Sequence, residues 1–248
     1  VGGDGTVSEV LDGTIQSGRR DLKMGVLYSG TSPDFCTFHR IPVAGKQAVE
    51  ALAADASRAV DVARVAFADS RGKMRISHFG CGANIGTGAS IARISNRIRR
   101  FTGDKAGTCL AAVYSIFAQA PLDLELTIDG SQHELKTVNN LSILKSPFLA
   151  SGLKLNLNLR PDDGKLVVVA VHGKRGAGLL PILAGFYSGK AVEREDVFVR
   201  ECREVKIACQ RNTELEFDGD PRGFLPVEIV IMPRTLNLIG TRTGNERV

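Results

Sequence analysis

Apolar residues near the start of the chain recur with helical spacing. They are Val7, Val10, Leu11 and Ile15, directly after a run of glycines. The segment Thr6-Val7-Ser8-Glu9 has the form of a capping box, in which threonine and glutamate satisfy each other's backbone donors, so we expect a helix to start at Thr6. A strand is expected at residues 24–28 and an alanine-rich helix at residues 44–56. This alternation is typical of an α/β layer.

From residue 61 onward the pattern changes to the alternation expected of strands. Residues 61–67 and 74–79 flank the polar turn Asp69-Ser70-Arg71-Gly72 and predict a β-hairpin. Residues 122–128 and 133–138 flank Asp129-Gly130, which tolerates the positive φ angles of a type I′ turn, and predict another. Further strands are expected at residues 165–171, 197–209, 213–217 and 226–232, and helices at residues 88–101, 104–120 and 176–188.

These patterns predict an α/β plus all-β protein with two domains. Residues 1–68 and 233–248 are expected to form the α/β domain, and residues 69–232 a two-layer β-sandwich. The composition, with 43% hydrophobic and 24% charged residues, fits a soluble globular protein with a substantial core. No apolar stretch approaches the roughly 20 residues needed to span a bilayer, so we expect no membrane span.

Charge and cysteine content narrow the classes of partner. A net charge of +5 favours anionic partners, but aromatic residues make up only 6% and do not interleave with the basic ones. Single-strand nucleic-acid binding needs aromatic stacking platforms, so we expect no nucleic-acid partner. Five scattered cysteines without a Cys-x-x-Cys pair predict free thiols in a reducing cytoplasm, and the four histidines lack the spacing of a metal site.

The opening Gly2-Gly3-Asp4-Gly5-Thr6 is the strongest local signal for chemistry. Glycines let a backbone approach phosphate oxygens, and a following helix offers unpaired N–H groups at its positive end. Asp4 would repel a phosphate but could partner a phosphate-bound Mg²⁺. The chain has no Walker A sequence.

Several motifs in order along the chain resemble those of the diacylglycerol kinase catalytic-domain family, which is related to sphingosine kinases. Gly-Gly-Asp-Gly-Thr is followed by Gly30-Thr31-Ser32-Pro33-Asp34-Phe35, which is similar to the family's Gly-Thr-x-Asn-Asp-Phe except for the proline. Asp162-Asp163-Gly164-Lys165-Leu166 resembles the family's Asp-Asp-Gly-x-Leu, and Asp218-Gly219-Asp220 resembles its Asp-Gly-Glu. The resemblance covers essentially the whole chain. It implies that the family's first strand and helix, with an Asn-Pro-x-Ser/Gly loop, would precede Val1.

The resemblance implies a partial Rossmann-like nucleotide domain, related to those of phosphofructokinases and NAD kinases, and an ATP- and Mg²⁺-dependent lipid kinase. The implied nucleotide-site residues are Gly2, Gly3, Asp4, Gly5, Thr6, Gly30, Thr31, Asp34 and Asp61, of which Asp4, Asp34 and Asp61 would surround the Mg²⁺ through water. Asp218 is the implied general base, supported by Asp220, whose neighbouring charge we expect to raise its proton affinity. A second, structural Mg²⁺ would bind Asp163 and the backbone carbonyls of Arg160 and Lys165.

The resemblance also implies a diacylglycerol-like lipid substrate and a cytoplasmic enzyme with transient, peripheral membrane contact. A basic helix with Arg93, Arg97, Arg99, Arg100 and nearby Lys105 could rest on an anionic leaflet or be a solvated face. A sphingosine, ceramide or NAD kinase, and a non-catalytic lipid-binding protein, stay open as alternatives. Oligomeric state is open too, including a homodimer.

Overall fold

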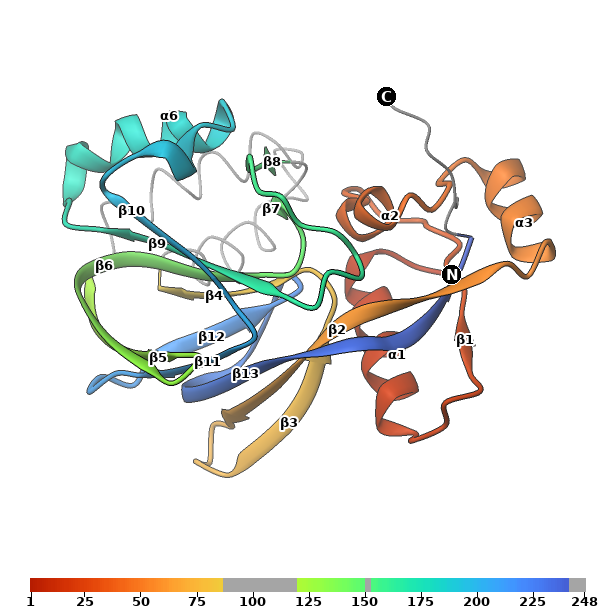
Figure 1. The fold of residues 1–248 in the computed structure, drawn as a ribbon, viewed down its shortest axis with the longest axis horizontal. Helices are drawn as coiled ribbons and strands as arrows, with labels where there is room; N and C mark the ends of the chain where they lie inside the picture. The colour runs from red at the N-terminus through yellow and green to blue at the C-terminus, as the bar shows by residue number, and fades with distance from the viewer. Residues whose placement is uncertain (87–119, 150–152, 241–248) are drawn as a thin grey trace.

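The computed structural model describes residues 1–86, 120–149 and 153–240 and contains a helical part beside a large β structure (Figure 1). The helices expected at residues 88–101 and 104–120, with the basic residues named above, lie outside the described residues apart from position 120. The helical part contains α1 (Asp4–Gln16), β1 (Lys23–Met24), α2 (Asp34–His39) and α3 (Gly45–Ala53). The predicted alternation of helix and strand is therefore present.

The β structure is one eleven-stranded sheet that partly closes on itself. Besides β1 it contains β2 (Ser57–Ala68), β3 (Met74–Phe79), β4 (Gly82–Gly86), β5 (Leu122–Ile128), β6 (Ser131–Leu144), β9 (Leu166–His172), β10 (Val197–Cys202), β11 (Glu204–Ala208), β12 (Glu214–Phe217) and β13 (Asp220–Ile239). Strands β6, β4, β12, β13, β11 and β5 follow one another, and β5 pairs again with β6. The two layers predicted for the β-sandwich are therefore parts of one sheet, and strand pairing joins them at both edges.

Smaller elements cover one side of this sheet. The short strands β7 (Phe148–Leu149) and β8 (Leu153–Lys154) pair with each other. A 3₁₀ turn (Gly176–Leu179) leads into α6 (Leu180–Tyr187), and a second such turn (Ala191–Glu193) follows. Leu179, Ile182 and Ala191 pack against Val167, Val169 and Val171 of β9, which explains why β9 is apolar on both faces.

Two strands differ from their sequence-based predictions. The strand expected at residues 197–209 is two strands, because the chain changes partners at Arg203: β10 pairs with β9, whereas β11 pairs with β13 and β5. The strand expected at residues 226–232 is the middle of the 20-residue β13. Prolines and polar residues at 220–223 and 233–235 interrupt the apolar pattern, so the sequence does not indicate the full length of β13. The pairing of β13 with β2 shifts register near both segments.

Strands β2 and β13 connect the two parts of the molecule. Val60 and Val62 of β2 belong to the core beneath the helices, whereas Ala63, Val65 and Phe67 belong to the core of the closed sheet. Figure 1 shows the pair running from one part to the other. The division at residues 68 and 233 remains a proposal, since both strands contribute to both cores.

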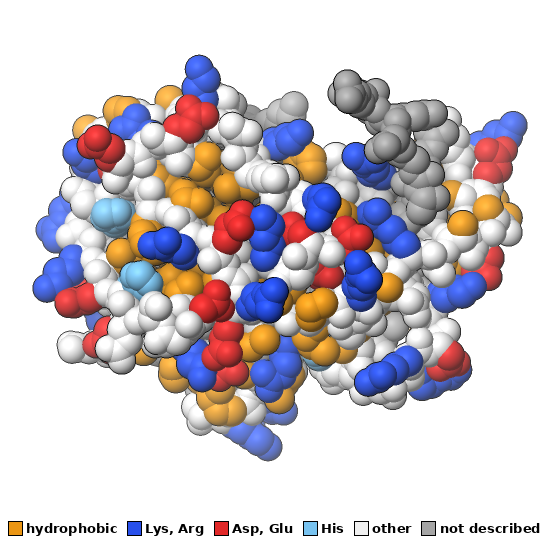
Figure 2. Space-filling model, in the orientation of Figure 1, with side chains coloured by type: hydrophobic (Ala, Val, Ile, Leu, Met, Phe, Trp, Pro, Cys, Tyr) orange, Lys and Arg blue, Asp and Glu red, His pale blue; other side chains and the backbone are white. Residues whose placement is uncertain are grey.

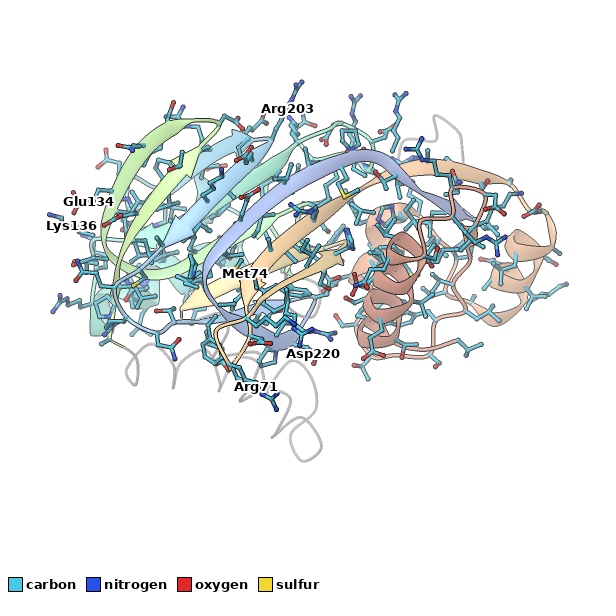
Figure 3. All side chains as sticks on the ribbon, turned by 90° about the horizontal axis from the view of Figure 1, so that it is seen from below. Arg71, Met74, Glu134, Lys136, Arg203 and Asp220 are labelled. Atoms are coloured by element: carbon cyan, nitrogen blue, oxygen red, sulfur yellow. The ribbon has the colours of Figure 1, made fainter. Side chains whose placement is uncertain are left out.

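Figure 3 shows Asp220 on the side of the sheet toward the helices, and Glu134 and Lys136 at its opposite end. On the face in Figure 2, basic and acidic side chains are interspersed. The four cysteines in the described ranges are free, as predicted. Within the same ranges, no helix is long and apolar enough to cross a membrane.

Candidate active site

The glycine loop leads directly into α1. The helix begins at Asp4, two residues earlier than predicted, and Gly3 is the N-cap without a side-chain hydrogen bond, so the expected capping box at Thr6 is wrong. The side chain of Thr6 instead packs over Gly2, where an added Cβ would lie 2.5 Å from Thr6 Cβ. The Val7 N–H donates to the Gly3 carbonyl at 3.0 Å, so the backbone N–H groups before Val7 have no acceptor within the helix. This end of α1 therefore favours an anion.

The second predicted motif lies against this loop. The Gly2 N–H donates to Leu27 O at 3.1 Å, and the Ser29 N–H donates to Gly2 O at 3.0 Å. A Cβ on Gly30 would lie only 2.7 Å from the Gly3 Cα, so position 30 requires glycine because the two backbones touch. Gly30 and the adjacent Thr31 are exposed beside the start of α1.

Asp4 lies in a group of three carboxylates drawn from three distant motifs. Its Oδ2 accepts a hydrogen bond of 2.9 Å from the Tyr28 hydroxyl. Burial raises the pKa of Asp4 to about 6, the Tyr28 hydrogen bond opposes this, and the negative charges of Asp34 and Asp218 add to it. Asp4, Asp34 and Asp218 therefore lie close enough for their charges to interact.

Asp218 is held by a ring of donors at the turn after β12. Its carboxylate accepts hydrogen bonds from the backbone N–H groups of Gly80 at 3.0 Å, Cys81 at 2.9 Å and Gly82 at 3.3 Å. Burial raises its pKa, and these three bonds and one from the Ser8 side chain oppose the rise. The largest cause is therefore burial, and not the neighbouring Asp220 that the sequence suggested.

Asp220 points toward the start of α1. A Cβ added to Gly5 would lie 3.6 Å from Asp220 Oδ2, and the same oxygen is 3.4 Å from the Arg222 guanidinium. A carboxylate at the first turn of a helix is stabilised by the helix dipole. Asp220 therefore connects the β12–β13 turn to the glycine loop.

Glu216 was not predicted from the sequence. It is 2% exposed, accepts a hydrogen bond of 2.6 Å from the Asn84 amide and another from the Gly219 N–H, and thus braces the turn that carries Asp218 and Asp220. Burial raises its pKa to about 8. Asn84 Oδ1 in turn accepts from the Ser142 hydroxyl at 2.6 Å. Only the register of β4, β6 and β12 reveals this polar chain, because Glu216 follows the same alternation of glutamate and apolar residues as Glu214 in β12.

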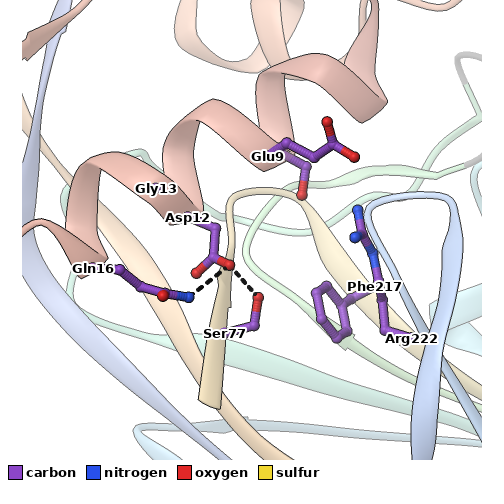
Figure 4. Close-up of a pocket in the computed structure, with 8 residues that line it drawn as sticks. Glu9, Asp12, Gly13, Gln16, Ser77, Phe217 and Arg222 are labelled. Carbon is purple, nitrogen blue, oxygen red and sulfur yellow. Dashed lines mark hydrogen bonds between the residues drawn. The ribbon is translucent and has the colours of Figure 1, made fainter. Parts of the chain in front are cut away.

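A small pocket lies next to the carboxylates, on the side of α1 that faces β3 (Figure 4). It lies between α1, β3 and the β12–β13 hairpin and is lined by Ser8, Glu9, Asp12, Gly13, Gln16, Ser77, Phe217 and Arg222. Asp12 accepts hydrogen bonds there from Gln16 and Ser77, at 2.9 and 2.8 Å. Since Ser8 bonds Asp218, the pocket is next to the implied general base.

The other predicted residues lie in a separate buried cluster. Asp61 accepts hydrogen bonds from the N–H groups of Gly164 at 2.7 Å and Arg234 at 2.9 Å, and pairs with Lys145. Its carboxylate is therefore engaged here, which differs from the nucleotide-site role expected of it. Asp163 pairs with the same lysine, which also contacts the carbonyls of Arg160 and Lys165.

The donor set around Asp4 fits a cation held through water. Asp4 Oδ1 and the Ser32 hydroxyl are buried, with no hydrogen-bond partner among the described residues. Buried polar atoms are normally paired, so these two oxygens are available to bind water or a hydrated cation. Within the described ranges, no group of three or more His, Cys, Asp or Glu side chains is arranged to bind a metal directly.

Two family models together cover most of the chain. Residues 82–240 match the YegS C-terminal NAD kinase beta sandwich-like domain, and residues 1–65 match the diacylglycerol kinase catalytic domain. The first alone covers more than half of the chain. The chain belongs to the diacylglycerol kinase family, and its all-β part is the sandwich-like domain of that family.

Individual proteins agree with this assignment. The chain is 25% identical over 234 residues to a diacylglycerol kinase of Staphylococcus carnosus (strain TM300), covering 93% of this chain and 72% of the relative. It is 23% identical over 242 residues to that of Staphylococcus haemolyticus (strain JCSC1435), covering 96% and 69%.

Solved structures show the same fold. The crystal structure of a diacylglycerol kinase from Bacillus anthracis str. Sterne superposes with a TM-score of 0.63 at 18% identity, covering 96% of this chain and 74% of that one. Another structure from the same strain reaches 0.71 at 20% identity, covering 96% and 76%. At these identities the likeness concerns the fold alone.

Proposed function

We propose that this chain is the catalytic part of a lipid kinase that transfers the γ-phosphoryl group of ATP to the hydroxyl of diacylglycerol or a similar lipid. The observation that carries the proposal is the meeting of Asp4, Asp34 and Asp218 at the glycine loop and the start of α1. Family membership and the names of the Staphylococcus relatives support the same reaction.

The nucleotide phosphates bind at the N-terminus of α1 in this proposal. Gly2, Gly3, Gly5 and Thr6 form the backbone cradle, and Gly30 and Thr31 close one side of it. Asp4 and Asp34 hold Mg²⁺ through water, with Asp4 Oδ1 as the best placed oxygen because it is buried and unpaired among the described residues. Bound Mg²⁺ supplies charge neutralisation on the phosphates during transfer.

Asp218 accepts the proton of the attacking lipid hydroxyl. Its pKa is raised by burial, which suits a base that must work near neutral pH, while its backbone donors hold it in one orientation. Asp220 and Glu216 position the turn that carries it. We place the polar end of the lipid in the pocket beside Ser8, Phe217 and Arg222.

The acceptor lipid resides in a bilayer, so we propose transient contact with a membrane surface on the cytoplasmic side. Lys and Arg side chains near an anionic leaflet each add about 1 kcal/mol of attraction. Sedimentation with vesicles, with and without anionic lipid, tests this contact: binding that increases with anionic lipid is expected, and none to either vesicle contradicts it.

A substrate panel tests the function. The protein is incubated with γ-labelled ATP and Mg²⁺ and, separately, diacylglycerol, sphingosine, ceramide, NAD or no acceptor. Labelled product with diacylglycerol supports the proposal. Labelled product only with sphingosine, ceramide or NAD selects another kinase of the same fold. Absence of both product and Mg·ATP binding identifies a non-catalytic member.

A further inference from the structure

Lys145 is a charged residue whose side chain is fully buried. It follows directly after β6, its side chain is 0% exposed, and it contacts two segments that are distant in sequence, β2 at Asp61 and the loop of residues 160–165. Its Nζ is 2.6 Å from Asp163 Oδ1, 2.7 Å from Arg160 O, 3.0 Å from Asp61 Oδ2 and 3.4 Å from Lys165 O. An ammonium group is thus surrounded by four oxygens, two of them from carboxylates.

The two carboxylates are satisfied on their other sides as well. Asp61 accepts from Gly164 and Arg234, and Asp163 Oδ2 accepts from the Arg160 N–H at 2.8 Å. The Asp61 N–H also donates to Pro161 O at 2.8 Å, which ties β2 to the loop of residues 160–165. A buried ion pair is stable only with this kind of complete hydrogen bonding.

Asp163 and the carbonyls of Arg160 and Lys165 are the same three groups that the resemblance assigned to a structural Mg²⁺. Magnesium binds oxygens at about 2.0–2.1 Å in an octahedron. An ion at that distance from these oxygens would overlap Lys145 Nζ, and two cations would repel each other at contact distance. The distances from Nζ to its four oxygens instead suit N–H···O hydrogen bonds. The residues do not fit a metal while Lys145 is present.

We propose that the Lys145 ammonium is the structural cation of this chain and occupies the position of a divalent metal. It neutralises Asp61 and Asp163 and fixes the loop of residues 160–165 against β2 and β6. The fold of this region therefore does not depend on Mg²⁺, and the inference is independent of the proposed function.

The first test needs no mutation. Thermal unfolding of the protein without nucleotide is followed in chelator and in millimolar Mg²⁺ or Ca²⁺. An unchanged melting temperature is expected. If Mg²⁺ raises the melting temperature of the wild type but not of Asp163→Asn, a metal binds in this cluster and the proposal is overturned. If Mg²⁺ raises the melting temperature of both proteins, the metal binds at another site and the proposal is supported.

The second test converts the cluster into a metal site. Lys145→Ala leaves two carboxylates and two carbonyls around an empty space, so we expect a melting temperature lower by roughly 10 °C in chelator and largely restored by Mg²⁺ or Ca²⁺. Lys145→Met fills the space without charge and should be destabilised with no restoration. A Lys145→Ala protein as stable as the wild type, or one that no cation restores, contradicts the proposal. If Lys145→Ala does not fold, the first test decides alone.

Discussion

The Tyr28 hydroxyl donates a hydrogen bond of 2.9 Å to Asp4 Oδ2, which links the strand side of the glycine loop to the first residue of α1. The same hydroxyl accepts from the Ser32 N–H at 3.1 Å, so Tyr28 joins the glycine loop to the motif of residues 30–35. This contact favours the ionised form of Asp4, whose pKa burial raises to about 6.

Tyr28→Phe should therefore weaken Mg·ATP binding at neutral pH. Removing a hydrogen bond to a carboxylate costs about 1.5–3 kcal/mol when nothing replaces it, so the pKa of Asp4 rises further and less of it is ionised at pH 7. Calorimetric titrations at several pH values should show that Mg·ATP binding is lost on acidification at a pH about one unit higher in the variant than in the wild type. Thr14→Val, which removes an exposed hydroxyl near the other end of α1, is the control. An unchanged pH profile in Tyr28→Phe would show that Asp4 does not govern binding.

Gly30→Ala tests the contact between the two loops. The added Cβ would lie 2.7 Å from Gly3 Cα and 2.6 Å from the Tyr28 hydroxyl oxygen, so the loops must separate. We expect a loss of about 1–3 kcal/mol in the free energy of unfolding and at least tenfold weaker nucleotide binding. Gly45→Ala, where an added Cβ meets nothing within 4 Å, should be neutral or slightly stabilising. Equal behaviour of the two variants contradicts the close approach.

Glu216→Gln tests the buried carboxyl beneath the Asp218 turn. The pKa of Glu216 is raised from 4.5 to about 8, so between these values the folded state keeps a proton that the unfolded state releases. Its stabilising contribution is full below about pH 4.5 and is lost as the pH rises through about 8. Glutamine mimics the neutral acid once the Asn84 amide rotates to present its oxygen to the glutamine NH₂ group. The variant should therefore not lose this stability as the pH rises.

Unfolding in denaturant at several pH values measures the effect. The variant should gain stability relative to the wild type as the pH rises from 5 to 8, by at most about 1.4 kcal/mol per pH unit. Asp4 and Asp218 also have raised pKa values and add to the slope in both proteins, so the difference between the proteins is the quantity to compare. A difference independent of pH means that Glu216 is ionised in the folded protein.

The sequence predicted the parts of the site that depend on local motifs. Asp4, Asp34 and Asp218 were predicted because each lies in a short motif with neighbouring glycines, and in the structure their charges lie close enough to interact. Glu216, Asn84 and Lys145 were missed, since their roles depend on the pairing register of β4, β6 and β12 and on the loop of residues 160–165. Periodicity assigns strands without assigning partners, so a buried charge such as Lys145 has no signature until its neighbours are known.

The same limit explains the errors in the fold. Thr6-Val7-Ser8-Glu9 fits the capping-box pattern, but α1 begins at Asp4 and the Thr6 side chain packs over Gly2. The length of β13 was underestimated because its prolines and polar residues are accommodated by bulges opposite β2. In β13, long-range pairing overrode local preference.

The rate of lipid phosphorylation by Asp218→Asn tests the central claim most directly. Asparagine tolerates the positive φ of 49° at this position, but it cannot accept the proton. The control is Asp55→Asn, at a surface position with a φ of 46°. The account predicts that Asp218→Asn binds Mg·ATP within a few-fold of the wild type while its turnover with diacylglycerol falls about 10²–10⁴-fold, and that Asp55→Asn is unaffected. Turnover by Asp218→Asn close to the wild-type rate would contradict the account.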